Sequence, residues 1–171
     1  MTDDENIAKL CNMIRNYGQE NRYEHKIFGM NSRLDEIQAA ILSVQLKHID
    51  EMTQTRIAIA SKYQEALQEC PLIQLPAIQP NTKHVFHLYV IQAQQRDTLK
   101  DFLETKGIQT LIHYPIPIHR QQLFGHKYDD IYLPVTEQKV ATILSLPIHP
   151  FLTDTEVDYI CSSIKEFHHE I

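Results

Sequence analysis

The sequence predicts a protein of the α/β class, in which a helical arm precedes a small α+β domain of helices packed on a sheet. Residues 34–69 follow a helical pattern without Gly or Pro, which predicts one long bridging helix. Three apolar runs rich in strand-forming residues lie between residues 84 and 148. Amphipathic helical patterns at residues 95–106 and after residue 153 supply the layer that covers such a sheet.

The composition is that of a globular protein without a nucleic-acid or membrane surface. Among 171 residues, 43% are apolar and 22% are charged, and a formal net charge of −6 is spread over interspersed acids and bases. No apolar stretch reaches about 18 residues and no basic-then-apolar leader is present. Three distant cysteines, without a CxxC pair, indicate free thiols in a reducing compartment. We expect a soluble, cytoplasmic protein.

The arm begins with a short helix. Residues 2–5 (Thr-Asp-Asp-Glu) form a capping-box pattern, and an apolar stripe at helical spacing follows up to Ile14. Because the chain starts directly in a well-formed helix, we expect a preceding segment in the complete protein. A polar segment with several aromatic residues, 16–33, separates this helix from the long one.

The long helix over residues 34–69 would span about 50 Å at about 1.5 Å per residue. Its first half, to about residue 49, is apolar nearly all round, whereas its second half carries a narrower apolar stripe. A helix of this kind connects two layers or two domains. Pro71 ends it, so the predicted domains are residues 1–70 and 71–171.

The second domain alternates strands and helices. The predicted strands are 84–91, 108–112 and the run 143–148, which Pro147 restricts to an edge strand or an ordered loop. Gly107 ends the helix 95–106. The last helix starts at the capping sequence Thr153-Asp154-Thr155-Glu156.

The first candidate site is the end of the polar segment, Gly29-Met30-Asn31-Ser32-Arg33. Gly29 permits a close backbone approach, and Asn31 and Arg33 can donate hydrogen bonds to phosphate oxygens near a helix start. In the alternative interpretation, Asn31 or Ser32 only caps the long helix and Arg33 is solvated. Spacing alone leaves both interpretations open.

The second candidate site is the segment from His113 to His119, which contains Tyr114 and two prolines. The prolines hold the chain extended, so that the histidines and the tyrosine point in defined directions, as a ligand pocket requires. Alternatively, the histidines at this strand end only satisfy nearby backbone groups. Both readings stay open.

Other chemistries find no support in the residue patterns. Ten histidines are present, but there is no HExxH, no CxxC and no clustered carboxylate spacing, so we expect no metal site. There is also no nucleophile elbow, no P-loop and no GxGxxG, which disfavours a hydrolase, an ATPase and a dinucleotide enzyme.

The two candidate segments carry a family resemblance that extends over essentially the whole chain. The sequences Arg15-Asn16-Tyr17-Gly18-Gln19 and Gly29-x-Asn31-Ser32-Arg33-Leu34-Asp35-Glu36, then residues 107–119, Leu133-Pro134-x-Thr136-Glu137 and Leu144-Ser145-Leu146-Pro147-x-His149-Pro150, follow in order. They resemble the second half of the DegT/DnrJ/EryC1/StrS aminotransferases. Residues 110–117 are most similar to members that aminate C3 of a dTDP-linked 3-keto-6-deoxyhexose.

The resemblance implies a pyridoxal-phosphate-dependent transferase of fold type I, active as a homodimer with sites at the subunit interface. It implies glutamate as amino donor and a keto-sugar nucleotide as acceptor, for surface polysaccharide or glycoside biosynthesis. Asn31 corresponds to the residue that binds the cofactor phosphate of the partner subunit. Arg33 corresponds to a position that meets the sugar nucleotide, and His113, Tyr114 and, less closely, His119 to positions near the sugar.

One departure from the family limits what this chain does by itself. The Schiff-base lysine of the family, the acid beside the pyridine nitrogen and the phosphate-binding serine all precede the matched segment, so no catalytic residue is assigned here. We therefore expect a C-terminal fragment of the enzyme that is inactive alone and does not bind the cofactor covalently. The alternative is a stand-alone, non-catalytic binding or dimerisation module derived from such an enzyme.

Overall fold

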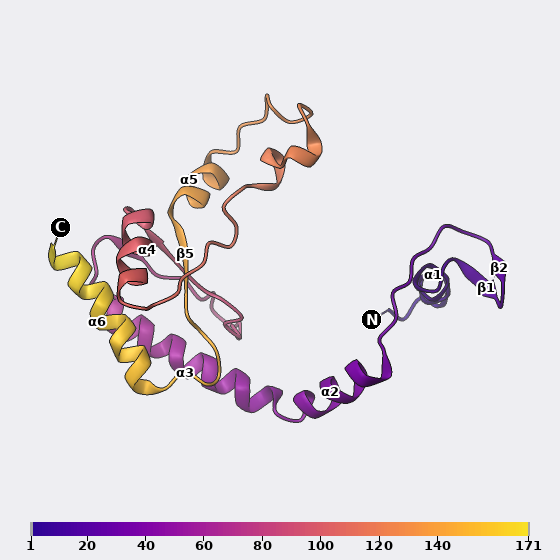
Figure 1. Cartoon of the computed structure of the whole chain (residues 1–171), viewed down its shortest axis with the longest axis horizontal. Helices are drawn as coiled ribbons and strands as arrows, with labels where there is room; N and C mark the ends of the chain where they lie inside the picture. Colours follow the sequence, from indigo (N-terminus) through magenta and orange to yellow (C-terminus); the bar gives the residue numbers. More distant parts are fainter. Residues whose placement is uncertain (1, 171) are drawn as a thin grey trace. The chain divides into compact units, whose positions relative to one another are not determined.

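The computed structural model describes residues 2–170, of which 169 and 170 are described by their backbone only. The chain forms two compact units, Met1–His48 and Ile49–Ile171 (Figure 1). The first is helical with a small hairpin, and the second packs helices on a three-stranded sheet. The predicted mixed fold class is confirmed, whereas the predicted division after residue 70 stays a prediction about the complete protein.

The first unit begins with helix α1 (Glu5–Arg15). Asp4 caps it, because its carboxylate accepts hydrogen bonds from the backbone N–H groups of Asn6 and Ile7 at 2.8 and 3.1 Å. The polar segment after α1 contains a short antiparallel hairpin of β1 (Gln19–Asn21) and β2 (Glu24–His25), which the sequence patterns did not predict.

The predicted long helix is two helices, α2 (Glu36–Leu46) and α3 (Ile49–Leu67), joined by a turn at residues 47–48. At this turn the backbone N–H groups of Lys47 and His48 donate to carbonyl groups three residues back instead of four, at 3.2 and 3.0 Å. No residue of α2 is buried, so no packing within the described chain holds a continuous helix at this point. The helical residues were predicted correctly and the continuity was not.

The sheet of the second unit has the order β3-β4-β5, with all pairs antiparallel. Its strands are β3 (Ile73–Gln74), β4 (Tyr89–Ala93) and β5 (Ile143–Leu146). In β4–β5 the register places Tyr89 opposite Leu146 and Gln92 opposite Ile143. Strand β5 lies at the edge of this sheet and stops before Pro147, in agreement with the predicted edge strand.

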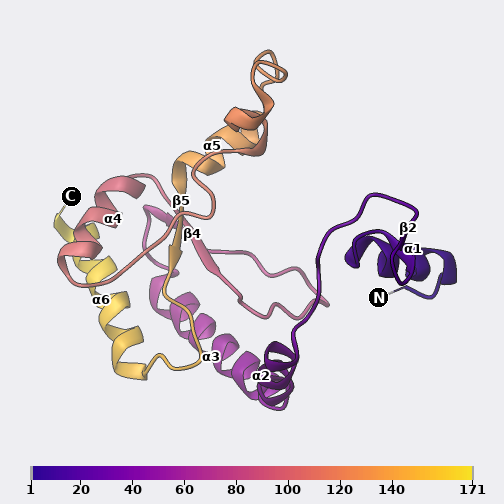
Figure 2. The same cartoon turned by 45° about the vertical axis from the view of Figure 1, so that its right-hand side comes forward.

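Helices α3, α4 (Arg96–Thr105) and α6 (Asp154–Glu170) pack with this sheet (Figures 1 and 2). The capping box at Thr153 and Glu156 is present, since each residue's side chain accepts a hydrogen bond from the other's backbone N–H at 2.8 and 3.3 Å. Together these elements enclose one apolar core. Its fully buried side chains include Tyr63, Leu67, Tyr89, Ile91, Leu99, Leu103, Leu144, Val157 and Ile164.

Two predicted strands differ from the structure. The strand predicted at 84–91 begins only at Tyr89, because Phe86 has a positive φ of 48° and its N–H donates to the His84 side chain. The run 108–112 makes a single antiparallel bridge, between Leu111 and Ser145, instead of a full strand.

Between that bridge and β5 the chain leaves the sheet as a lobe, residues 113–133, and returns through helix α5 (Pro134–Thr142). The lobe has two short 3-10 turns, Ile118–Arg120 and Gln122–Phe124, and is drawn in orange in Figure 1. Pro134 occupies the first position of α5, where its missing N–H is tolerated. No helix within residues 2–170 is both long and apolar enough to cross a lipid bilayer.

The three cysteines provide a test of this fold. Cys11 is exposed, whereas burial raises the pKa of the Cys70 thiol and raises that of Cys161 to about 11. In the native chain at neutral pH we expect iodoacetamide to label Cys11 alone, because thiolate is scarce and inaccessible at the other two. Peptide mass spectrometry measures the labels, with all three cysteines labelled in denaturant as the control. Native labelling of Cys161 at the rate of Cys11 would contradict the packing of α6.

Candidate ligand-binding segments

A loop in the first unit is held by the contact of two glycines. Gly18 has a φ of +73°, and a Cβ atom placed on it would lie 1.7 Å from the carbonyl oxygen of Ile27. A Cβ on Gly29 would lie 2.1 Å from the backbone nitrogen of Gly18. Only residues without a side chain permit this approach, so the loop 16–33 folds back onto the end of α1.

Asn31 sits where this loop pairs with the residues after α1. Asn16 and Asn31 form an antiparallel bridge, and the neighbouring backbone N–H groups of Tyr17 and Ser32 donate to Met30 and Arg15 at 3.0 and 2.9 Å. Backbone bonds on both sides therefore fix the position of the Asn31 side chain, which is exposed.

The capping alternative for this segment is wrong. The N-cap of α2 is Asp35, and the side chain of Gln38 accepts a hydrogen bond from the Asp35 backbone N–H at 3.3 Å. Asn31 and Ser32 therefore precede the helix instead of capping it. The guanidinium of Arg33 is not simply solvated either, since it donates to the Asn16 side chain and lies 5.6 Å from the centre of the Tyr17 ring.

The charged side chains around the loop are mostly paired. Lys9 and Lys26 both contact Glu20, and hydrogen bonding to Lys26 lowers the pKa of Glu20 to about 2. The Nε–H of Arg15 donates to the carbonyl oxygen of Ser32 at 3.1 Å. Arg33, two residues after Asn31, likewise has a neutral hydrogen-bond partner, the Asn16 side chain, and is suited to receive an anion.

Beside the loop is a hollow of about 560 Å³, lined by residues 25–29 and Tyr17. His25 contributes its ring to this wall and its Nδ1 lies 2.8 Å from the carbonyl oxygen of Tyr17. Because a carbonyl oxygen only accepts, the proton of a neutral His25 is on Nδ1. The hollow combines aromatic and polar walls, as small-molecule sites do.

In the second unit, His113 and Tyr114 follow the bridge at Leu111. The Nδ1 of His113 lies 2.8 Å from the Ser145 hydroxyl oxygen, and the Tyr114 ring meets the His113 ring edge-on with 5.5 Å between centres. Tyr114 is 71% exposed. A hollow of about 220 Å³ adjoins His113, and its polar lining comes from His87, Gln109, His113 and Ser145.

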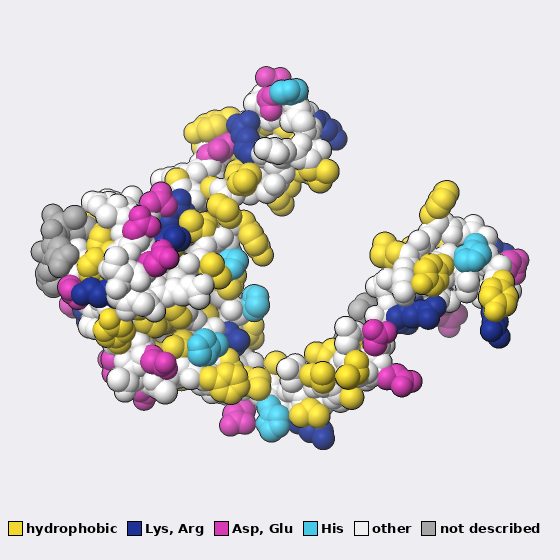
Figure 3. Space-filling model, in the orientation of Figure 1, with side chains coloured by type: hydrophobic (Ala, Val, Ile, Leu, Met, Phe, Trp, Pro, Cys, Tyr) yellow, Lys and Arg dark blue, Asp and Glu magenta, His cyan; other side chains and the backbone are white. Residues whose placement is uncertain are grey.

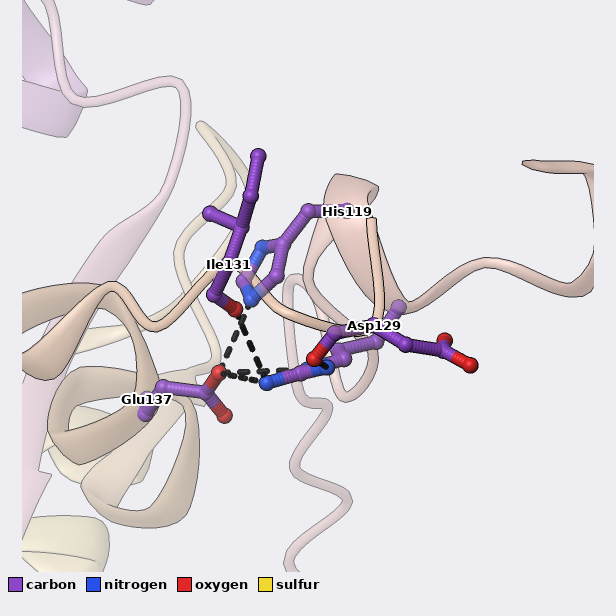
Figure 4. Close-up of polar contacts among 5 residues, drawn as sticks. His119, Asp129, Ile131 and Glu137 are labelled. Atoms are coloured by element: carbon purple, nitrogen blue, oxygen red, sulfur yellow. Dashed lines mark hydrogen bonds and ion pairs between the residues drawn. The ribbon is translucent and has the colours of Figure 1, made fainter. Parts of the chain in front are cut away.

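His119 lies within the lobe, where it faces Glu137 of α5 (Figure 4). Its Nε2 is 2.8 Å from Oε1 of Glu137 in α5, and only 9% of its side chain is exposed. Arg120 donates to the same carboxylate oxygen at 3.2 Å, and also to the backbone carbonyl groups of Asp129 and Ile131 at 3.2 and 3.0 Å. These bonds fasten both arms of the lobe to α5, and hydrogen bonding to His119 lowers the pKa of Glu137.

The structure thus places Asn31 with Arg33 in one segment and His113 with Tyr114 in another. The close backbone approach predicted at Gly29 is confirmed, whereas sequence patterns did not identify the parts played by Ser145, Glu137 and Gly18. The available signal for Ser145 was a lone hydroxyl inside the apolar run 143–148. Among residues 2–168, whose side chains the structure describes, no three His, Cys, Asp or Glu side chains are grouped as metal ligands.

The cluster around Glu137 gives a testable consequence for the lobe. We expect Glu137→Gln to increase amide hydrogen exchange in residues 116–133, because the neutral amide weakens the bonds to Arg120 and His119. Exchange in β4 and β5 should not change. The depressed pKa of Glu137 adds a pH dependence: its carboxylate protects the lobe above the ordinary glutamate pKa, and the protection is lost as pH falls through the lowered value.

Mass-spectrometric hydrogen exchange measures this effect. Glu104→Gln is the matched control, since Glu104 is an exposed residue of α4 paired with Lys100 at 3.6 Å. Unchanged lobe protection in Glu137→Gln would show that other contacts hold the lobe.

Known proteins match the chain along nearly its whole length. A sequence profile of the DegT/DnrJ/EryC1/StrS aminotransferase family matches residues 1–165. The dTDP-3-amino-3,6-dideoxy-alpha-D-galactopyranose transaminase of Aneurinibacillus thermoaerophilus is 39% identical over 166 residues, which are 97% of this chain and 45% of that protein. The chain spans less than half the length of the curated relatives it matches, at their C-terminal end.

Solved structures agree with the sequence comparison. DesV of S. venezuelae, in complex with a ketimine intermediate, matches all of this chain and 46% of its own, with a TM-score of 0.89 and 35% identity. NtdA of Bacillus subtilis with bound cofactor PMP matches 98% of this chain and 41% of its own, with a TM-score of 0.88 and 30% identity. The loop around Asn31 and the segment after Leu111 lie within the matched regions. This chain therefore belongs to the DegT/DnrJ/EryC1/StrS aminotransferase family.

Proposed function

We propose that this chain supplies the C-terminal part of a pyridoxal-phosphate-dependent aminotransferase that acts on a keto-sugar nucleotide. The proposed amino donor is glutamate and the proposed acceptor is a dTDP-linked 3-keto-6-deoxyhexose, in the synthesis of a surface polysaccharide or a glycoside. The observation that carries the proposal is the family match over residues 1–165. A stand-alone binding or dimerisation module is not favoured, because several curated relatives are named as sugar transaminases.

The residues of the loop fit the phosphate of the cofactor. Asn31 is exposed, its backbone is fixed by the bridge to Asn16, and no hydrogen bond of its side-chain amide occurs among the described residues. The amide can therefore donate to a phosphate oxygen of the partner subunit's cofactor without giving up another bond. When bound, pyridoxal phosphate carries the amino group and withdraws electrons from the carbon that exchanges it.

The other site residues are assigned to the sugar nucleotide. Arg33 would exchange its bond to the neutral Asn16 amide for a charge-assisted bond to a diphosphate oxygen. His113 and Tyr114 would contact the sugar, His113 through hydrogen bonds and Tyr114 through its exposed ring and hydroxyl. His119 has Nε2 engaged with Glu137, so a contact with substrate would use Nδ1.

Helix α2 supports association with further polypeptide. Its residues Ile37, Ile41, Leu42, Val44 and Leu46 are all at least half exposed, and apolar side chains gather along α2 in the space-filling view (Figure 3). A helix that is apolar on most sides is normally buried. We propose that the preceding part of the enzyme and a second subunit cover it, and that the chain alone self-associates.

A chimaera tests the proposed function directly. The N-terminal part of the A. thermoaerophilus transaminase, joined to this chain, should aminate a dTDP-3-keto-6-deoxyhexose with glutamate as donor, with the product detected by mass spectrometry. This chain alone should give no product. A chimaera that folds and retains pyridoxal phosphate but aminates no keto-sugar nucleotide would refute the proposal, provided that the intact relative is active in parallel.

The cross-subunit assignment of Asn31 has its own test in the same chimaera. Asn31→Ala should weaken cofactor retention roughly tenfold or more, since a hydrogen bond to a charged group contributes about 1.5–3 kcal/mol. Mixed with subunits that lack the cofactor-binding lysine, it should form heterodimers in which one site retains both groups. At a cofactor concentration too low to saturate Asn31→Ala, we expect more activity in the mixture than in either parent. Ser32→Ala mixed in the same way serves as the control for subunit exchange. Heterodimers without recovered activity would place Asn31 in its own subunit's site.

A further inference from the structure

Ser145 joins three parts of the second unit at one buried position. It lies within β5, opposite Val90 of β4, and is 4% exposed. On its other side, its backbone N–H donates to the Leu111 carbonyl oxygen at 2.7 Å and its carbonyl oxygen accepts from the Leu111 N–H at 3.2 Å. It is also the only polar residue of the apolar run 143–148.

The side chain of Ser145 is directed to His113. Its hydroxyl oxygen lies 2.8 Å from Nδ1 of His113, and no other hydrogen bond to this imidazole occurs among residues 2–170. A buried hydroxyl without a partner would destabilise the core, so this contact has a physical reason to persist. Because Leu111 is bonded to the same serine and only Ile112 separates it from His113, the ring has little freedom.

Hydrogen bonds to the residues that follow Ser145 keep it in place. The Tyr63 hydroxyl in α3 donates to the Pro147 carbonyl oxygen at 2.8 Å, and the Arg56 guanidinium donates to that of Ile148 at 2.7 Å. Tyr63 is fully buried. The end of β5 is thus bonded to helix α3 as well as to β4. The backbone of Ser145, from which the hydroxyl extends, is therefore fixed in position.

We propose that Ser145 is a positioning residue that sets both the orientation and the tautomer of His113. An unprotonated imidazole nitrogen is a more basic acceptor than a hydroxyl oxygen, so the Ser145 hydroxyl donates to Nδ1. The proton of the neutral ring is then on Nε2, because the bond at one ring nitrogen decides which nitrogen carries the proton. His113 thereby presents an N–H donor, suited to a hydroxyl or carbonyl oxygen of a sugar. The inference rests on the proposed function for the identity of that ligand.

The tautomer of His113 can be measured in this chain without substrate or cofactor. Long-range ¹H–¹⁵N spectra of the labelled chain, at a pH where the ring is neutral, distinguish protonation at Nε2 from protonation at Nδ1. His113→Gln identifies the signals. We expect the Nε2–H pattern in the wild-type chain, and its replacement by a mixture of both tautomers in Ser145→Ala. Ser145→Thr retains the hydroxyl and should restore the single pattern.

Ser162→Ala is the matched control, since Ser162 is an exposed serine whose hydroxyl donates within α6 to the Tyr159 carbonyl oxygen. It should leave the His113 signals unchanged. An Nδ1–H pattern in the wild-type chain would overturn the proposal, even if Ser145→Ala failed to fold. A spectrum of Ser145→Ala identical to that of the wild type would also overturn the proposal. Neither result depends on turnover, so failure here is separate from failure of the chimaera.

Discussion

The burial of one small sheet under helices is the constraint on which the second unit depends. Its strands have two, five and four residues, too few to persist alone in water. Alternate residues of β4, namely Tyr89, Ile91 and Ala93, are buried in the core that α3, α4 and α6 share. Since this packing fixes β5, it also fixes Ser145 and, through the bridge at Leu111, the start of the segment that carries His113 and Tyr114.

Elements defined by local signals were predictable from the sequence. The helices near residues 95–106 and after residue 153 have clear apolar stripes, and a cap or glycine marks an end of each. Both predicted bounds of α4 and the predicted start of α6 therefore agree with the structure within about two residues. The strand at 84–91 was placed too early, because β-forming residues do not reveal that Phe86 adopts a positive φ and bonds locally to His84. The break between α2 and α3 contains no Gly or Pro, so periodicity could not reveal it.

The candidate site residues likewise include some whose roles were predictable from the sequence and some whose roles were not. The roles expected for Asn31, Arg33, His113 and Tyr114 follow from the motifs that contain them. Ser145 and Glu137 also lie in motifs, but their roles depend on partners 32 and 18 residues away. Such pairings form only when the chain folds, and single-sequence patterns do not contain them. Metal sites, CxxC pairs and nucleotide-binding loops have short local motifs. The sequence alone therefore sufficed to disfavour those chemistries.

The backbone contact between Gly18 and Gly29 helps to fix the conformation of the loop, which leaves its exposed side chains available for ligand contacts. Its path is set by two residues that have no side chain, by main-chain bonds beside Asn31 and by the side-chain bonds of Arg15 and His25 to the main chain. Fully exposed residues such as Phe28 therefore contribute little to its shape. Those positions are therefore open to mutational drift while the anchor remains constant. A scaffold of this kind lets selection, or an engineer, retune ligand preference one surface residue at a time.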